Sequence, residues 1–315
     1  MALPALAASG GADVVVLRGL APLLELAPGG GRVIPLDRGS GGFLATARTL
    51  RQRRYRRGIL LPPSLSSALL FAAGGVRCRR GTPTDGRRVL LHDSVPAASL
   101  RPMHRAAAYL LLVTGEAPAV LPAPRLVVPK SLRERWRALV GVEHGSWIGV
   151  FPGSNAPSRR WEPTRFAELV RLLTRRGYRV AVFGGPGERE LTRTVAGSAG
   201  LDFGGRTDLP LLAAALAECT LLVSNDSGPM HLAAAVGTPT ISLWGAGDPA
   251  ITAPLGRSHE LIRRAELPCV PCVKNECPRR GRGYVLDDAH RECMRLIQID
   301  DIDAAVSGRA SSVSP

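Results

Sequence analysis

In the second half of the chain, short apolar runs alternate with longer runs that are apolar on one face. The run 147–151 is typical of a buried strand. The run 163–177, opened by Pro163 and closed by Gly177, is typical of an amphipathic helix. Strand and helix repeated in this order predict a parallel sheet with right-handed crossovers and helices on both faces. Further strands are predicted at 178–183, 201–203, 220–223 and near the end of 223–245, with helices at 188–197, 209–219 and within 223–245.

The first half alternates in the same way, but less regularly. A proline-rich passage at 116–129 separates the halves and is the predicted linker. Two α/β domains joined by a linker imply a cleft between them. The predicted strands of the first half are 14–17, 32–36, 58–61 and 87–91, and the predicted helices are 43–55, 64–75 and 101–115.

Length and charge narrow the class of protein. A chain of 315 residues suits two domains of ordinary size. The formal net charge of +15 favours an anionic partner, such as nucleic acid, a phosphorylated substrate or an acidic membrane face. Nearly all of the positive charge is arginine, which a GC-rich genome also explains. With aromatic residues at only 4%, base-stacking platforms are scarce, so no nucleic-acid partner is expected.

No targeting segment is evident in the sequence. No apolar run approaches the roughly 20 residues that span a bilayer, and the first residues lack the basic region of a signal peptide. The chain is therefore expected to be cytoplasmic, and six cysteines in that compartment argue against a disulfide framework. The arginines between Arg51 and Arg57 would favour anionic lipid or a phosphorylated acceptor.

The segment 223–245 places polar residues where a predicted helix follows a strand. A helix N-terminus leaves unpaired N–H groups and a partial positive charge, so Ser227 and Gly228 are suited to cradle an anion. A neutral His231 in the first turn would donate to a phosphate oxygen. Asp226 suits a sugar hydroxyl or a helix cap. The alternative is that Asp226 or Ser227 only caps the helix and that His231 is an ordinary surface residue.

A second polar loop, 151–161, follows another predicted strand of the same sheet. Ser154 and Asn155 offer donors, and Arg159 or Arg160 can bind a diphosphate through two hydrogen bonds. The alternative is a solvated arginine pair in a turn. Because parallel strands end at one edge, both loops are expected there, where ligands bind in such sheets.

A third loop, 183–190, ends the neighbouring predicted strand. It does not match the dinucleotide fingerprint. Glu188 can take ribose hydroxyls, although a glutamate in a first helical turn more often stabilises the helix. Three loops with complementary groups on one edge favour a nucleotide-diphosphate site.

These loops, together with 209–245 and 50–81, resemble the ADP-heptose:lipopolysaccharide heptosyltransferases of glycosyltransferase family 9, and most of all the heptosyltransferase II branch. The resemblance implies a GT-B fold, in which two Rossmann-like α/β domains face each other across a cleft. Residues 1–125 would form the acceptor side and 126–315 the nucleotide-sugar side. It implies transfer of heptose from ADP-heptose, without a catalytic cofactor, to the lipopolysaccharide inner core or a related glycan. The partners would be an ADP-sugar donor and an anionic glycolipid acceptor, with peripheral contact at the inner membrane.

The resemblance also assigns roles to residues. Arg159 would stabilise the leaving diphosphate at a position where the family usually has lysine. Ser64 and Ser67 match the acceptor-side loop, although helix N-capping is the stronger interpretation of both. Donor binding is implied for Ser154, Asn155, Arg160, Glu188, Asp226, Ser227, Gly228 and His231.

The family's catalytic base is an aspartate in a Gly-Asp loop after its first strand. Asp13 is a candidate by position, but 12–36 resembles the family's second strand, and 1–9 resembles the helix after that loop. This register predicts that the first strand and the base lie upstream of Met1. Little or no transferase activity is therefore expected of the 315-residue chain.

Four cysteines near the C-terminus have partly metal-like spacing. Four thiolates at Cys269, Cys272, Cys277 and Cys293 would hold a structural zinc or iron. Similar cysteines occur in some heptosyltransferases, and ordinary thiols explain the pattern equally. Asp301 and Asp303 imitate a metal-binding pair, but acidic residues in a first helical turn explain them better.

Two other functions remain open from the sequence. One is a GT-B glycosyltransferase that uses another nucleotide sugar, because the loops address the diphosphate more than the sugar. The other is a truncated, non-catalytic relative that keeps the nucleotide site.

Overall fold

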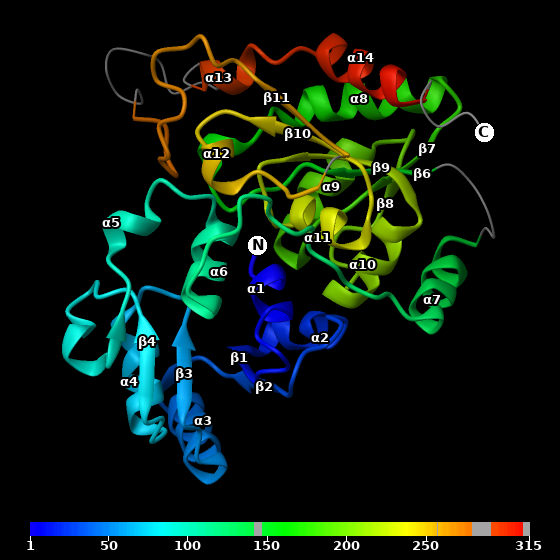
Figure 1. Cartoon of the computed structure of the whole chain (residues 1–315). Coiled ribbons are helices and arrows are strands. Elements are labelled where there is room, and N and C mark those ends of the chain that lie inside the picture. The colour runs from blue at the N-terminus through cyan, green and yellow to red at the C-terminus, as the bar shows by residue number, and fades with distance from the viewer. Residues whose placement is uncertain (142–146, 257, 279–290, 311–315) are drawn as a thin grey trace. The chain divides into compact units, whose positions relative to one another are not determined.

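The computed structural model describes residues 1–141, 147–256, 258–278 and 291–310. It divides into two compact units, Met1–Pro124 and Arg125–Pro315 (Figure 1). No helix within these ranges is both long and apolar enough to cross a membrane.

Unit 2 is built on a six-stranded sheet in which every strand pair is parallel, in the order β11-β10-β9-β6-β7-β8. From β6 the chain proceeds outward in one direction through β7 and β8, and from β9 in the other through β10 and β11. The order therefore reverses between β6 and β9, and ligands in open α/β sheets bind at such a point. The strands are β6 (Trp147–Phe151), β7 (Arg179–Val182), β8 (Leu201–Asp202), β9 (Cys219–Asn225), β10 (Thr240–Trp244) and β11 (His259–Arg263).

Helices cover both faces of this sheet (Figure 1). Alternation along β6 sends Ile148 and Val150 into one core and Trp147 toward the other face, where it packs against Trp136. The predicted elements of this half are present. The helix α7 was not predicted from the sequence. One face carries α8 (Pro163–Arg175), α9 (Arg189–Ala196) and α14 (Ile299–Ala310); the other carries α7 (Lys130–Val140), α10 (Leu209–Ala217) and α11 (Gly228–Val236).

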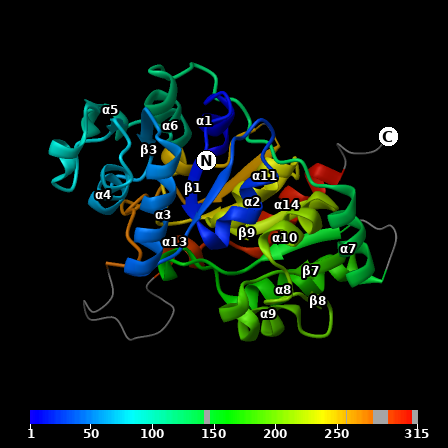
Figure 2. The same ribbon diagram turned by 90° about the horizontal axis from the view of Figure 1, so that it is seen from below.

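Unit 1 contains two parallel sheets, one of order β1-β2 and one of order β3-β4-β5. Helix α3 packs against α4 (Figure 2) and also against β2. Leu50 of α3 shares a core with Ile34 and Leu70. The strands are β1 (Val14–Leu17), β2 (Val33–Leu36), β3 (Arg57–Leu60), β4 (Cys78–Gly81) and β5 (Asp93–Ser94). The helices are α1 (Leu3–Ala7), α2 (Ala21–Leu24), α3 (Gly39–Arg53), α4 (Leu65–Ala73), α5 (Ala97–Leu100) and α6 (Arg105–Thr114).

The strand predicted at 87–91 is wrong. Arg87–Leu90 forms a 3₁₀ turn, η2, and Val89 is 89% exposed. The strand in this part of the chain is β4, which was not predicted because its sequence is polar. The arginines of β4 fit beside the sheet because their guanidinium groups reach carbonyls: Arg79 Nε donates to Leu90 O at 2.6 Å and Arg80 Nε to Leu112 O at 2.9 Å.

Asp13 connects the amino ends of β1 and β3. Its carboxylate accepts from the Tyr55 hydroxyl and, at 2.8 Å, from the N–H of Arg32. These hydrogen bonds lower the pKa of Asp13, while burial and the Asp13 carboxylate raise the pKa of Tyr55 to about 12. Asp13 lies at the amino ends of the strands, whereas ligands of parallel sheets bind at the carboxyl ends. Its role here is therefore structural.

Candidate functional site

The loops after β6 and β9 leave the sheet side by side, because Phe151 pairs with Ser224. A fully buried Asn225 fastens them together. Its Nδ2 donates to Pro152 O at 2.7 Å, and its Oδ1 accepts from the N–H of Trp161 at 3.0 Å. Asn225 was not predicted from the sequence, although an asparagine at the end of an apolar strand is a signal for such a role. The arrangement brings Ser154 to the segment after β9, where its Oγ donates to Asp226 O at 3.3 Å.

Arg159 and Asp226 form an ion pair within this site. Arg159 Nη1 lies 3.0 Å from Asp226 Oδ2, and the carboxylate is 3% exposed. Burial raises the pKa of Asp226, and the Arg159 guanidinium opposes that rise. Gly247 leaves room for the carboxylate, because a Cβ there would lie 2.0 Å from Oδ2.

The N-terminus of α11 opens beside this pair. Ser227 is the N-cap residue but makes no capping hydrogen bond through its side chain. Within the described residues, Ser227 Oγ and Arg159 Nε are buried without a hydrogen-bond partner. The space around Gly228 is open, and a partly buried His231 lies in the first turn. The alternative in which Asp226 or Ser227 only caps the helix is therefore not seen in the described part of the chain. The backbone N–H groups at this helix terminus stay available to an anion.

The remaining predicted donor residues have other contacts. Arg160 Nε donates to Ser154 O at 2.8 Å, and Asn155 is exposed. Glu188 accepts from the N–H of Gly185 at 2.8 Å, so it stabilises the turn before α9. Its carboxylate also lies against Gly153, where a Cβ would meet Oε1 at 1.9 Å. The loops after β6 and β7 are thereby in contact.

The two predicted acceptor residues lie in unit 1, at the start of α4. Ser64 caps the helix, its side chain accepting from the N–H of Ser67 at 3.4 Å. Ser67 Oγ donates to Ser64 O at 2.7 Å and accepts from Arg87 Nη1 at 3.1 Å. Fully buried Arg87 also donates to the carbonyls of Pro62 and Thr82, each at 2.7 Å. Arg87 thus joins the loops at the carboxyl ends of β3 and β4.

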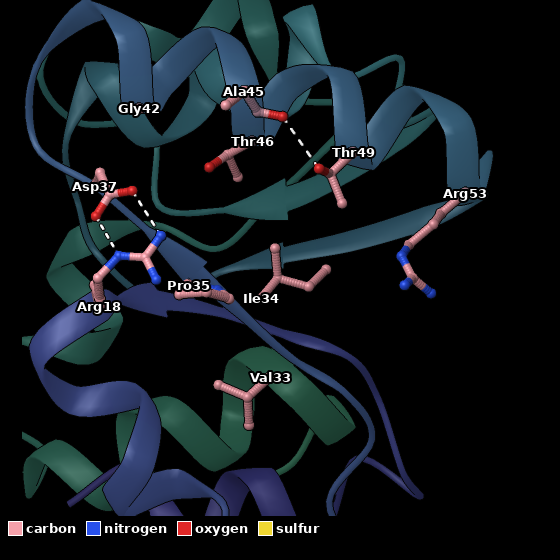
Figure 3. Close-up of a pocket in the computed structure, with 10 residues that line it drawn as sticks. All are labelled: Arg18, Val33, Ile34, Pro35, Asp37, Gly42, Ala45, Thr46, Thr49 and Arg53. Atoms are coloured by element: carbon pink, nitrogen blue, oxygen red, sulfur yellow. Dashed lines mark hydrogen bonds and ion pairs between the residues drawn. The ribbon is translucent and has the colours of Figure 1, made fainter.

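A cavity of about 340 Å³ lies in unit 1 between β2 and α3 (Figure 3). At one end Arg18 Nη2 donates to Asp37 Oδ2 at 2.7 Å, and these residues follow β1 and β2 directly. Arg53 lies at the other end (Figure 3). The lining includes Arg53 of the basic stretch Arg51–Arg57, but no predicted donor residue and neither Ser64 nor Ser67.

The structure gives no support to a metal site at the four cysteines. Across the described ranges, no group of three or more His, Cys, Asp or Glu side chains is arranged to hold a metal ion. Burial and the neighbouring Cys269, Cys272 and Cys277 raise the pKa of Cys293 to about 11. Asp301 lies in the first turn of α14 and accepts from the N–H of Gln298 at 2.7 Å, as the helix-start interpretation predicted.

A parallel sheet with polar side chains beside a helix N-terminus at its switch point is typical of enzymes that bind nucleotide phosphates. Comparison with known proteins identifies the class. The family model described as glycosyltransferase family 9 (heptosyltransferase) matches residues 43–281. The chain belongs to this family and is a glycosyltransferase.

Two curated relatives illustrate the similarity. The chain is 31% identical over 280 residues to the lipooligosaccharide heptosyltransferase 2 of Haemophilus influenzae, covering 81% of this chain and 80% of the relative. It is 29% identical over 273 residues to the lipopolysaccharide heptosyltransferase 2 of Escherichia coli, covering 80% and 78%.

Solved structures show the same fold. The ADP-heptose lipopolysaccharide heptosyltransferase II of E. coli matches with a TM-score of 0.82 at 24% identity, over 98% of this chain and 93% of that one. An E. coli heptosyltransferase solved with ADP matches with a TM-score of 0.72 at 17% identity, over 98% and 94%. The fold is therefore α/β of the GT-B class.

Proposed function

We propose that this protein transfers heptose from ADP-heptose to the inner core of lipopolysaccharide or to a related glycan. The two curated relatives are named heptosyltransferases, and each aligns with about four fifths of this chain. The observation that carries the donor assignment is the pair of buried, unpartnered polar atoms, Arg159 Nε and Ser227 Oγ, at the N-terminus of α11. In this proposal unit 2 binds the nucleotide sugar and unit 1 provides the acceptor side.

Arg159 and α11 would act on the departing diphosphate. Breaking the bond between the sugar and the diphosphate develops negative charge on the leaving group and an oxocarbenium-like sugar. The guanidinium and the positive end of α11 would stabilise that charge, and His231, Ser154 and Ser227 would donate to the phosphate oxygens. These groups would stabilise the negative charge of the leaving diphosphate, which in other enzymes a divalent cation stabilises.

Asp226 would have a different partner once the donor is bound. In the structure its carboxylate lies 3.0 Å from the Arg159 guanidinium. A diphosphate brings further negative charge to the same guanidinium and competes for it. Asp226 would then accept from a sugar hydroxyl, because a buried carboxylate that gives up its counter-charge needs a hydrogen-bond donor in its place. Asn155, Arg160, Gly228 and Glu188 would complete the donor contacts, Glu188 toward the ribose.

Ser64 and Ser67 would meet the acceptor at the carboxyl end of β3. The basic stretch from Arg51 to Arg57 would attract the acidic groups of a glycolipid or of an anionic membrane, so peripheral contact with the inner membrane belongs to this proposal. Both features lie within unit 1.

A second candidate is a glycosyltransferase reaction with another nucleotide sugar. The buried polar atoms of the site address a diphosphate, and the Glu188 carboxylate already accepts from Gly185. Neither feature selects adenosine or heptose.

Donor selectivity separates the two candidates. ADP-heptose, UDP-glucose and GDP-mannose are each titrated into the protein. Transfer to heptose-deficient lipopolysaccharide is measured through the amount of nucleotide released. The proposal predicts binding of ADP-heptose at least tenfold tighter than the other two. Binding selectivity tests the choice of donor independently of the turnover. Preference for UDP or GDP donors would overturn the proposal.

A further inference from the structure

The loop 151–161, which carries Arg159 and is called the diphosphate loop below, is hydrogen-bonded to a segment far away in the sequence. Ser158 is 3% exposed and lies directly before Arg159. Its N–H donates to Asn275 O at 3.0 Å, and its Oγ donates to Lys274 O at 2.5 Å. Two hydrogen bonds from one residue thus join the loop after β6 to the segment between β11 and α13 (Glu292–Arg295).

The same segment is also fastened to the loop after β10. The N–H of Val273 donates to Ala246 O at 2.8 Å, next to the Gly247 that makes room for Asp226. Val273 has a φ of +53°, which is strained for a β-branched residue, and its side chain is exposed. Such strain persists only where the surrounding contacts fix the backbone, and it gathers at ligand clamps. We call Val273–Asn275 the clasp.

Arg291 supports the loop at both ends of the turn that contains Ser158. Its Nη1 donates to Pro157 O at 3.1 Å and to Arg160 O at 2.9 Å. The backbone on either side of Arg159 is therefore anchored, while Arg159 itself is bound through its side chain to Asp226. Because the backbone that carries the Arg159 side chain is held on both sides, fewer positions are open to the guanidinium.

We propose that Ser158 is a positioning residue for the donor reaction: through its hydroxyl it ties the diphosphate loop to the clasp and fixes Arg159 where the diphosphate binds. This rests on the proposed function, because it assigns to Arg159 the contact with the diphosphate. Ser158 touches neither nucleotide nor sugar in this account. Its effect is transmitted only through the placement of Arg159.

The test compares ligands with and without the diphosphate. ADP and adenosine are titrated into wild type and Ser158→Ala, by calorimetry for ADP and by ligand-observed NMR for adenosine. Loss of one hydrogen bond predicts ADP binding weakened about three- to tenfold, with adenosine binding unchanged within twofold. A variant that merely unfolds in part would lose both ligands. Equal ADP affinity in wild type and Ser158→Ala would overturn the proposal.

A double-mutant cycle gives a second, independent readout. In an Arg159→Met background, adding Ser158→Ala is expected to change ADP affinity by less than twofold, because the group that Ser158 positions is absent. An undiminished effect in that background would contradict transmission through Arg159. Ser307→Ala is the matched control, since Ser307 lies on α14 and its hydroxyl accepts from Arg176 Nη1 at 2.6 Å. If wild type itself bound neither ADP nor adenosine, the proposed function would fail, and that outcome is distinct from a failure of the Ser158 proposal alone.

Discussion

Arg159 and Asp226 are 67 positions apart in the sequence and form a 3.0 Å ion pair in which the carboxylate is 3% exposed. The pair forms because β6 and β9 are adjacent, so the loops that follow them meet at the reversal of strand order. A buried carboxylate needs a partner to offset its lost hydration. Asp226 therefore holds at the site the same positive group that a diphosphate would bind.

Arg159→Met should destabilise the fold through Asp226. Removing the guanidinium leaves a buried carboxylate without a counter-charge. Because the Arg159 side chain is 25% exposed, we expect a loss of about 1–3 kcal/mol of unfolding free energy, below the range for fully buried pairs. Urea denaturation measures it. Arg159→Met/Asp226→Asn should recover much of the loss, and no recovery would contradict the pairing.

The stability of the protein should carry the pH signature of Asp226. A carboxyl group whose pKa is raised on folding holds its proton to higher pH in the native than in the unfolded state. Unfolding free energy therefore falls as pH rises from the ordinary value of 3.8 through the raised value. Asp226→Asn lacks this titration. The stability of wild type relative to Asp226→Asn should decline across that window and stay constant above it, and a rise instead would refute the assignment.

Gly247→Ala should disturb the site by steric contact. The added Cβ would lie 2.0 Å from Asp226 Oδ2 and 3.1 Å from the Trp244 ring, so the carboxylate must move. We expect a loss of about 1–3 kcal/mol in thermal or urea unfolding. Gly187→Ala is the matched control, because nothing lies within 4 Å of its Cβ position. Equal stability of the two variants would show that Asp226 is not confined there.

Glu218 should make unit 2 sensitive to acid. Its carboxylate accepts from Arg133 at 2.9 Å and from Arg137 at 2.9 Å, which joins α10 to α7. Burial raises the pKa of Glu218, but the two arginines together lower it below 4.5. The stabilisation is therefore present above that value and is lost as pH falls through the lowered pKa. Glu218→Gln should lower stability at neutral pH by about 1 kcal/mol and flatten the acid limb of the pH curve.

Most of the sheet of unit 2 was predictable because β6, β7, β9 and β10 are mainly apolar and the helices between them keep one apolar face. The edge strand β11, with the sequence His259-Glu260-Leu261-Ile262-Arg263, was not predicted because it is largely polar. Unit 1 was less predictable. The arginines of β4 donate to backbone carbonyls, so a strand forms there despite its polar sequence. The apolar residues of 87–91 imitate a strand, but they lie in a 3₁₀ turn in which Val89 is 89% exposed. Helix α7 was missed because Trp136 is its only fully buried residue in a highly charged segment.

The candidate site was predictable as a set of residue types, but its pairing was not. The sequence identifies anion-binding chemistry near Ser227 and near Arg159. It does not state the order of strands in the sheet, which decides that these loops meet. Glu188, Arg160 and Ser64 engage backbone groups in the structure, and local sequence cannot tell such contacts from ligand contacts.

The decisive measurement is calorimetric titration of ADP into wild type and Arg159→Met. Wild type is expected to bind ADP with micromolar affinity, and Arg159→Met to bind it about ten- to a hundredfold more weakly, since a charge-assisted contact with the diphosphate is removed. Circular dichroism of the variant establishes that it is folded. Absence of ADP binding by folded wild type, or equal affinity of the two proteins, would contradict a diphosphate site at the reversal point of the sheet.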